Sequence, residues 1–156
     1  MRFLIICFLL IGSQCFSAPI LEEIRSKFPF IENKEQAESY IKQLENTKDL
    51  SSQAYLAAMY FFKSKYVKFP TTKFKYFKKG KELLENLILN NPLNAELRYI
   101  RYIFQHQIPK FLGYYSAKSN DFEVIINSNF LKKKHLNNLL ELRQISEEHK
   151  QKLLQL

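Results

Sequence analysis

Two arginines and a glutamine near the middle of the chain are spaced so that they could act together. Arg98, Arg101 and Gln105 are three and four residues apart, which places them on one face of a helix. Arginine is favoured over lysine where a guanidinium is partly buried or pairs with a carboxylate through two hydrogen bonds. The row therefore either binds a partner's carboxylate or a phosphate in a concave site, or forms an internal ion-pair network that orients neighbouring helices.

The internal network needs acidic partners on adjacent helices. The candidates for these partners are Glu82, Glu85 and Glu96. We expect Arg101 to be structural, and Arg98, which is nearer the start of its predicted helix, to be the more exposed of the two.

A second candidate site is a lysine-rich segment that also contains many aromatic residues. The chain has a formal net charge of +9, and from Leu50 to Lys81 it carries eight lysines and no acidic residue. These lysines are Lys63, Lys65, Lys68, Lys73, Lys75, Lys78, Lys79 and Lys81. They either contact an anionic lipid or envelope surface, or form the solvated rim of a helical hairpin whose core is aromatic. Binding of nucleic acid is not expected, because the protein is predicted below to be exported.

The sequence contains no recognisable pattern of catalytic or metal-binding residues. His106, His135 and His149 fall on different predicted helices and form no metal-binding pattern, so we interpret them as solvent-exposed. The chain contains no nucleotide-binding glycine pattern and no G-x-S-x-G nucleophile motif. We therefore expect no catalytic residue, no cofactor and no enzyme activity.

The first 18 residues have the composition of a signal peptide. Arg2 precedes a ten-residue apolar run, and small residues lead up to Ala18. The run is shorter than the roughly 20 residues that a membrane-spanning helix needs. We predict export to the periplasm or the medium, without a transmembrane segment.

Both cysteines, Cys7 and Cys15, belong to this predicted signal peptide. The mature chain should therefore contain no disulfide and no cysteine-bound metal. A lipid anchor on Cys15 is disfavoured, because Gln14 stands where a lipoprotein signal has a small residue.

Apolar periodicity near 3.6 residues and helix-capping residues predict an all-α domain over residues 19–156. Asn33, Asn94 and Ser146 are the expected N-caps of three helices, and Ser51 or Ser52 and Thr71 or Thr72 are those of two more. The predicted helices cover 20–27, 34–45, Ser51 or Ser52 to 66, Thr71 or Thr72 to 89, 95–106, 120–127, 131–143 and 147–154. The inner face of the helix that ends near 89 should carry Phe74, Phe77, Leu84, Leu87 and Ile88, with Gly80 at a close approach to another helix.

Residues 51–107 resemble a tetratricopeptide (TPR) helical hairpin. The first helix has the leucine, small residue and tyrosine of that family at Leu56, Ala57 and Tyr60. The second helix matches at Gly80, Leu84, Leu87 and Pro92. The sequence departs from the family by an insertion over residues 64–74, by Gln53 at the Trp-like position, and by the two arginines of the next helix. The resemblance implies an array of antiparallel helical hairpins with a surface for a protein partner.

The segments 91–101 and 109–114 also resemble small exported bacterial proteins, a likeness that implies export and no particular chemistry. The sequence thus predicts an exported, non-catalytic helical protein that acts as a protein interaction module. The alternative is a peripheral binder of anionic membrane or envelope surfaces through the Lys63 to Lys81 segment.

Overall fold

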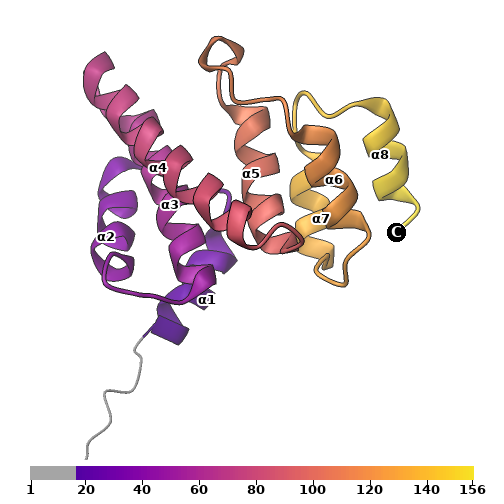
Figure 1. Ribbon diagram of the computed structural model, residues 1–156, viewed down its shortest axis with the longest axis horizontal. Coiled ribbons are helices and arrows are strands. Elements are labelled where there is room, and N and C mark those ends of the chain that lie inside the picture. The colour runs from indigo at the N-terminus through magenta and orange to yellow at the C-terminus, as the bar shows by residue number, and fades with distance from the viewer. Residues whose placement is uncertain (1–16) are drawn as a thin grey trace, which may run out of the picture.

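The computed structural model describes residues 17–156, and Figure 1 shows that helices make up its fold. Within this range there are eight α-helices, one short 3₁₀ helix (η1) and no strand, so the predicted all-α class is confirmed. The elements are α1 (Ser17–Lys27), α2 (Lys34–Leu44), α3 (Leu50–Tyr66), α4 (Pro70–Asn90), α5 (Ala95–Gln107), η1 (Lys110–Leu112), α6 (Lys118–Ile126), α7 (Lys133–Leu140) and α8 (Glu147–Leu154). The predicted signal peptide, apart from its last two residues, and both cysteines lie outside the described residues.

None of the helices between residues 17 and 156 combines the length and the apolar composition that crossing a membrane requires.

The side chains at the helix starts confirm part of the prediction and correct the rest. Asn33, Asn94 and Ser146 cap α2, α5 and α8 as expected, each accepting a hydrogen bond from a backbone N–H of the first turn. The expected caps of α3 were wrong, because Asp49 accepts the N–H of Ser52 and starts this helix earlier. The expected threonine caps of α4 were also wrong. This helix begins at Pro70, whose missing N–H costs nothing in a first turn.

The C-terminal helices differ in length from the prediction. α6 begins two residues earlier than expected and includes the apolar run 124–126. α7 is shorter than the predicted 131–143, because residues 141–146 form a connection to α8 rather than a further helical turn.

The core is built around α3, which is apolar on nearly all sides. A helix of this kind is stable only when neighbours cover its whole circumference, and α3 packs against α1, α2, α4 and α5. Phe28, from the loop after α1, places its ring within 6.2 Å (centroid to centroid) of four core rings. These rings belong to Tyr55, Phe62, Tyr99 and Phe104.

Gly80 lies at a close contact between α3 and α4, as predicted. A Cβ atom at this position would lie 2.8 Å from the carbonyl oxygen of Ala57 and 3.3 Å from the Phe61 ring. The predicted inner face of α4 needs a correction, because Phe74 is exposed and Leu87 only partly buried. The face that packs on α3 is centred on Phe77, Gly80 and Leu84.

A methyl group at Gly80 should weaken the α3–α4 contact. We expect Gly80→Ala to lower the free energy of unfolding by about 1–3 kcal/mol, because the backbone of α3 must shift. Because the 2.8 Å approach is to a backbone atom, we expect the upper part of this range, which exceeds the roughly 1 kcal/mol that alanine gains over glycine in a helix. Urea unfolding measures it, with Lys75→Ala, exposed on the same helix, as the control. An alanine variant as stable as the wild type would contradict the close packing.

Candidate functional site

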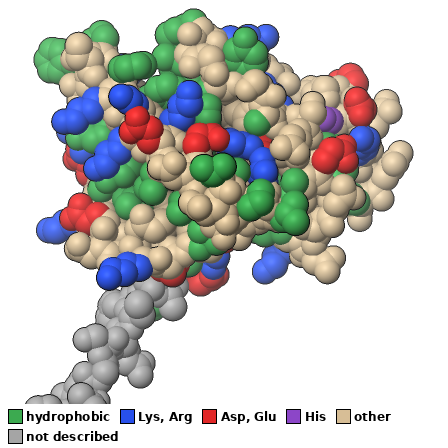
Figure 2. Space-filling model, viewed as in Figure 1, with side chains coloured by type: hydrophobic (Ala, Val, Ile, Leu, Met, Phe, Trp, Pro, Cys, Tyr) green, Lys and Arg blue, Asp and Glu red, His purple; other side chains and the backbone are tan. Residues whose placement is uncertain are grey.

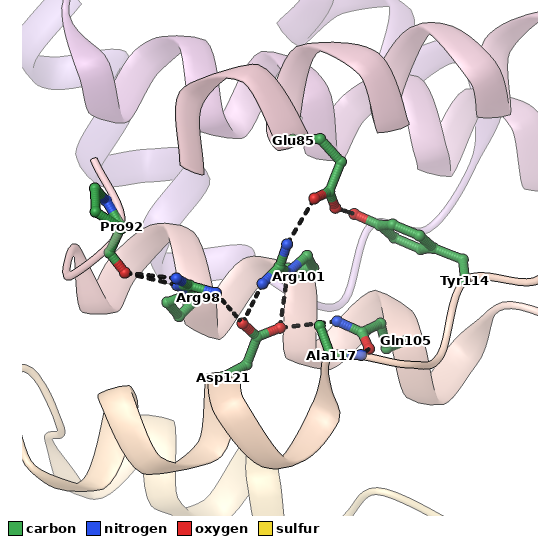
Figure 3. Close-up of polar contacts among 8 residues, drawn as sticks. All are labelled: Glu85, Pro92, Arg98, Arg101, Gln105, Tyr114, Ala117 and Asp121. Carbon is green, nitrogen blue, oxygen red and sulfur yellow. Dashed lines mark hydrogen bonds and ion pairs between the residues drawn. The ribbon is translucent and has the colours of Figure 1, made fainter. Parts of the chain in front are cut away.

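Asp121 is the centre of a buried polar network (Figure 3). Its two carboxylate oxygens accept four hydrogen bonds from three side chains of α5. Arg101 donates two of them, at 2.8 and 2.5 Å, Arg98 donates one at 2.9 Å, and Gln105 donates one at 2.8 Å. A carboxylate has about four lone-pair sites. Asp121 therefore has no acceptor position left for a ligand.

The remaining polar atoms of the arginine row also have partners inside the protein. Arg98 donates to the carbonyl oxygen of Pro92 at 2.9 and 2.7 Å, and Arg101 donates to Glu85 at 2.6 Å. The Gln105 side-chain oxygen accepts the backbone N–H of Ala117 at 3.1 Å. Below, "the Asp121 network" means Glu85, Arg98, Arg101, Gln105, Tyr114 and Asp121. Their contacts are those expected of the structural interpretation of the row.

Charge and burial act together in this network. Burial disfavours the charged form of Arg101, but its hydrogen bonds with Asp121 and the nearby charge of Glu85 raise the pKa of its guanidinium above the ordinary value. Burial, and then the charge of Glu85, raise the pKa of the Tyr114 phenol, which stays protonated and donates to Glu85 at 2.7 Å. The network thus joins α4, α5 and α6 to the chain after η1.

The sequence pointed to the arginines but not to their main partner. Of the three expected carboxylates only Glu85 is in the network, while Glu82 lies 3.6 Å from Lys78 and Glu96 lies 2.7 Å from Arg25. Asp121 is 20 or more residues from both arginines and resembles an ordinary acidic residue in the first turn of a helix. Its position as the one acid between Glu96 and Glu123 is the signal that could have drawn attention to it.

The expected contrast in exposure between Arg98 and Arg101 is almost absent, because both residues are buried. Their residues are 7% and 6% exposed, because both guanidiniums turn inward to Asp121. The position of Arg98 near the start of α5 does not bring it to solvent, since the Pro92 turn and α6 cover it.

Next to the Asp121 network the surface is hollowed into a groove of about 1240 Å³, which we call the aromatic groove. Five stretches line it: the loop after α1, the end of α3, the first half of α4, the end of α5 with η1, and the connection between α7 and α8. Its aromatic lining consists of Phe30, Phe61, Phe62, Phe74, Phe77, Phe104 and Phe111. On the face shown in Figure 2, hydrophobic side chains gather at the top of the view, over the start of α4 and the connection after α5.

The Asp121 network holds one wall of the aromatic groove in place. Tyr114, which donates to Glu85, packs its ring 5.7 Å from that of Phe61 and 6.1 Å from that of Phe77. Gly113, just before it, has φ +67°, a conformation that side chains other than glycine rarely adopt, and it ends η1. The turn thereby places Phe111 at the aromatic groove, while the hydrogen bond to Glu85 holds Tyr114 in the interior.

The predicted lysine site is not one continuous surface. Lys63 lies 3.0 Å from Glu38 on α2 and 4.2 Å from the Tyr76 ring, and Lys79 lies 4.2 Å from the Tyr60 ring. Lys81 lies 5.5 Å from the Tyr114 ring, and Lys78 pairs with Glu82. Lys65, Lys68 and Lys75 are exposed, while Lys73 donates to the carbonyl oxygen of Lys65. The eight side chains therefore point to several sides of α3 and α4.

The interpretation of the histidines as solvent-exposed was wrong. His149 is buried, its Nδ1 is 2.8 Å from the Tyr102 hydroxyl, and its ring stacks on Phe122 at 3.7 Å. His106 and His135 are partly buried, because each also packs on aromatic rings. In residues 17–156 no three His, Cys, Asp or Glu side chains lie close enough together to hold a metal ion.

Comparisons with known protein families, curated proteins and solved structures find no match to this chain. The arrangement of its own side chains is therefore the basis for any functional conclusion. That arrangement divides into a closed polar interior and an open apolar groove.

Removal of the Arg101 side chain should destabilise the protein, because it leaves the buried carboxylate of Asp121 without its main partner. Breaking a buried ion pair by removing one partner costs about 3–5 kcal/mol, so we expect Arg101→Ala to lower the melting temperature by many degrees. Arg143→Ala, at an exposed arginine, is the control and should change little. Asp121→Asn in the Arg101→Ala background should recover part of the loss. A melting temperature of Arg101→Ala within about one degree of wild type would contradict the structural role.

Acid should weaken the fold through His106. Burial lowers the pKa of His106 from 6.5 to about 4, so the unfolded chain binds a proton on this residue at a pH where the folded chain does not. Stability is therefore present above pH 6.5 and is lost as the pH falls toward 4. We expect about 1–2 kcal/mol of loss from pH 7 to pH 5, measured by urea unfolding. His106→Asn should lose less over the same range, and an equal loss in both proteins would contradict the assignment to His106.

Proposed function

We propose that this chain is a non-catalytic helical binding protein that holds an amphipathic helix of a partner protein in the aromatic groove. The observation that carries the proposal is the groove itself, with its aromatic lining and a volume of about 1240 Å³. A helix about 10 Å across fills that volume over about 16 Å, which is about three turns. Three turns present apolar anchors at i, i+3 or i+4, and i+7, the usual pattern of a helix bound in a groove.

The rigid walls of the aromatic groove support binding without rearrangement. Phe61, Phe62 and Phe104 belong to the aromatic core, and their ring centroids lie 4.5 to 5.2 Å apart where Phe104 meets the other two. Phe77 and Tyr114 buttress Phe61 from the side of the Asp121 network. A surface that is already ordered loses little conformational entropy on binding, which favours affinity.

Charges at the rim favour a partner helix with acidic flanks. Lys65, Lys73 and Arg143 line the aromatic groove together with Glu32 and Glu141. The rim is therefore basic on balance, and acidic residues on the partner would lie next to the lysines at the α3–α4 end. Complementary charge of this kind contributes mainly to specificity and to the rate of association.

The sequence resemblance adds to the proposal in two ways. The close contact between Ala57 and Gly80 joins the two positions where the TPR resemblance places small residues, which supports a TPR-like pairing of α3 and α4. Proteins of that family bind partners on helical surfaces, although a fold alone does not assign a function. We propose that this binding takes place outside the cytoplasm, as the predicted signal peptide implies.

A selection from a displayed library of 14-residue amphipathic helices tests the proposal. We expect enriched peptides to carry apolar residues at i, i+3 or i+4, and i+7 and a net negative charge. Fluorescence anisotropy should show that Phe74→Ser and Phe111→Ser each raise Kd about tenfold, equivalent to about 1.4 kcal/mol. Leu93→Ser, at an exposed leucine that does not line the groove, is the matched control. Enrichment of no peptide, or of peptides that bind the groove variants equally well, would refute the proposal.

A further inference from the structure

Every exposed phenylalanine of residues 17–156 lies in the lining of the aromatic groove or next to it. Phe30 is 60% exposed, Phe69 73%, Phe74 56% and Phe111 87%. Phe30, Phe74 and Phe111 line the aromatic groove, and Phe69 directly precedes Pro70, which also lines it. Two loops, η1 and the start of α4 therefore bring four phenylalanines to the mouth of one groove. We call this region the groove end.

Exposed cations surround these rings. Lys65 is in the last turn of α3 and Lys68 in the turn that follows it. Lys110 stands beside Phe111, and Arg143 lies in the connection after α7. Glu32 and Glu141 are the exposed acids among the lining residues. The groove end therefore combines projecting phenylalanine side chains with an excess of positive charge.

We propose that the groove end docks on an anionic lipid bilayer. Phe69 and Phe111 enter the boundary between head groups and acyl chains, and Lys65, Lys68 and Lys110 contact lipid phosphates. Neither feature alone holds a protein on a membrane firmly, but apolar insertion and basic charge together do. The proposal goes beyond helix binding, because Phe69, Lys68 and Lys110 do not line the aromatic groove.

Contacts within the protein occupy some lysines of the larger predicted set and so remove them from the docking surface. Lys63 and Lys79 lie against the Tyr76 and Tyr60 rings, and Lys63 also pairs with Glu38. Lys110 lies outside the lysine-rich segment and joins the groove end through the turn after α5. The membrane surface is thus smaller than the Lys63 to Lys81 segment and includes residues that the segment does not contain.

The placement of the exposed phenylalanine rings favours a bilayer over nucleic acid as the ligand of the groove end. Single-stranded nucleic acid binds along a continuous track of aromatic faces and cations. Here the most exposed rings, Phe69 and Phe111, stand on the α3–α4 turn and on η1, at separate places along the edge of the groove. Projecting side chains at the groove end suit insertion into a flat, deformable surface.

The absence of tryptophan from the chain makes insertion directly measurable. Phe69→Trp and Phe111→Trp each introduce a single tryptophan into protein purified from cells that express the full chain. With vesicles of equal parts phosphatidylglycerol and phosphatidylcholine, we expect a blue-shifted emission and quenching by brominated acyl chains. Leu93→Trp, at an exposed leucine away from the groove end, should show neither. An equal shift for Leu93→Trp, or no shift for the two groove-end variants, would overturn the proposal.

Co-sedimentation with the same vesicles tests the role of charge. Replacement of Lys65, Lys68 and Lys110 by glutamine should lower binding about a hundredfold, since each lysine at an anionic surface contributes about fivefold. The matched control replaces three other exposed lysines, Lys42, Lys48 and Lys150, by glutamine and changes net charge equally. Equal loss in both triple variants would show attraction without a docking face and would refute the proposal. So would wild-type binding that is as strong to pure phosphatidylcholine.

Two further measurements separate the alternatives. A tryptophan shift at position 111 caused by an oligonucleotide without lipid, and as large as that caused by vesicles, would assign the surface to nucleic acid and overturn the proposal. The Phe69→Ser variant distinguishes docking from helix binding. It should lower vesicle binding about tenfold while leaving the affinity for groove-selected peptides unchanged. Unchanged vesicle binding would remove Phe69 from the docking surface and contradict the proposal, whatever the peptides do.

Discussion

The burial of one carboxylate, that of Asp121, constrains the arrangement of the second half of the molecule. An ionised group out of contact with water is tolerated only when nearby charges and hydrogen bonds compensate it. Two arginines and a glutamine of α5 supply that compensation, and they do so in one orientation of α5 relative to α6. Arginine suits this position because its planar guanidinium can hold Asp121 and Glu85 at the same time, which a lysine ammonium on a flexible stem cannot do with the same geometry.

This constraint reaches the surface through Glu85 and Tyr114. Glu85 receives Arg101 on one side and the Tyr114 hydroxyl on the other, so the chain after η1 is tied to α4. The ring of Tyr114 then supports Phe61 and Phe77. The buried charges have their hydrogen-bonding capacity filled by the protein itself, and the exposed binding capacity lies in the aromatic groove and its rim. The Asp121 network and the aromatic groove are thus separate parts of the molecule, and the network supports one wall of the groove.

Local sequence signals predicted the helices well and failed where two local solutions compete. Asn33, Asn94 and Ser146 cap their helices because a short polar side chain directly before an apolar repeat has an N–H within reach. Ser51 and Ser52 have the same chemistry, yet Asp49 caps α3. Pro70 looks like a helix breaker but starts α4, because proline is disfavoured inside a helix and favoured in its first turn. Such choices depend on where the helix begins in the packed structure.

By itself, the sequence determined the all-α class, the placement of Arg98, Arg101 and Gln105 on one face of a helix, and the close approach at Gly80. These features depend on spacings of three or four residues and on side-chain size, which neighbouring positions encode. Only the tertiary structure decided that Asp121 is the partner of the row, that the lysines point to several sides, and that four exposed phenylalanines lie in or next to one groove. Each of these depends on residues far apart in the chain, whose meeting is set by how the helices pack around α3. Periodicity along one helix carries no information about that packing.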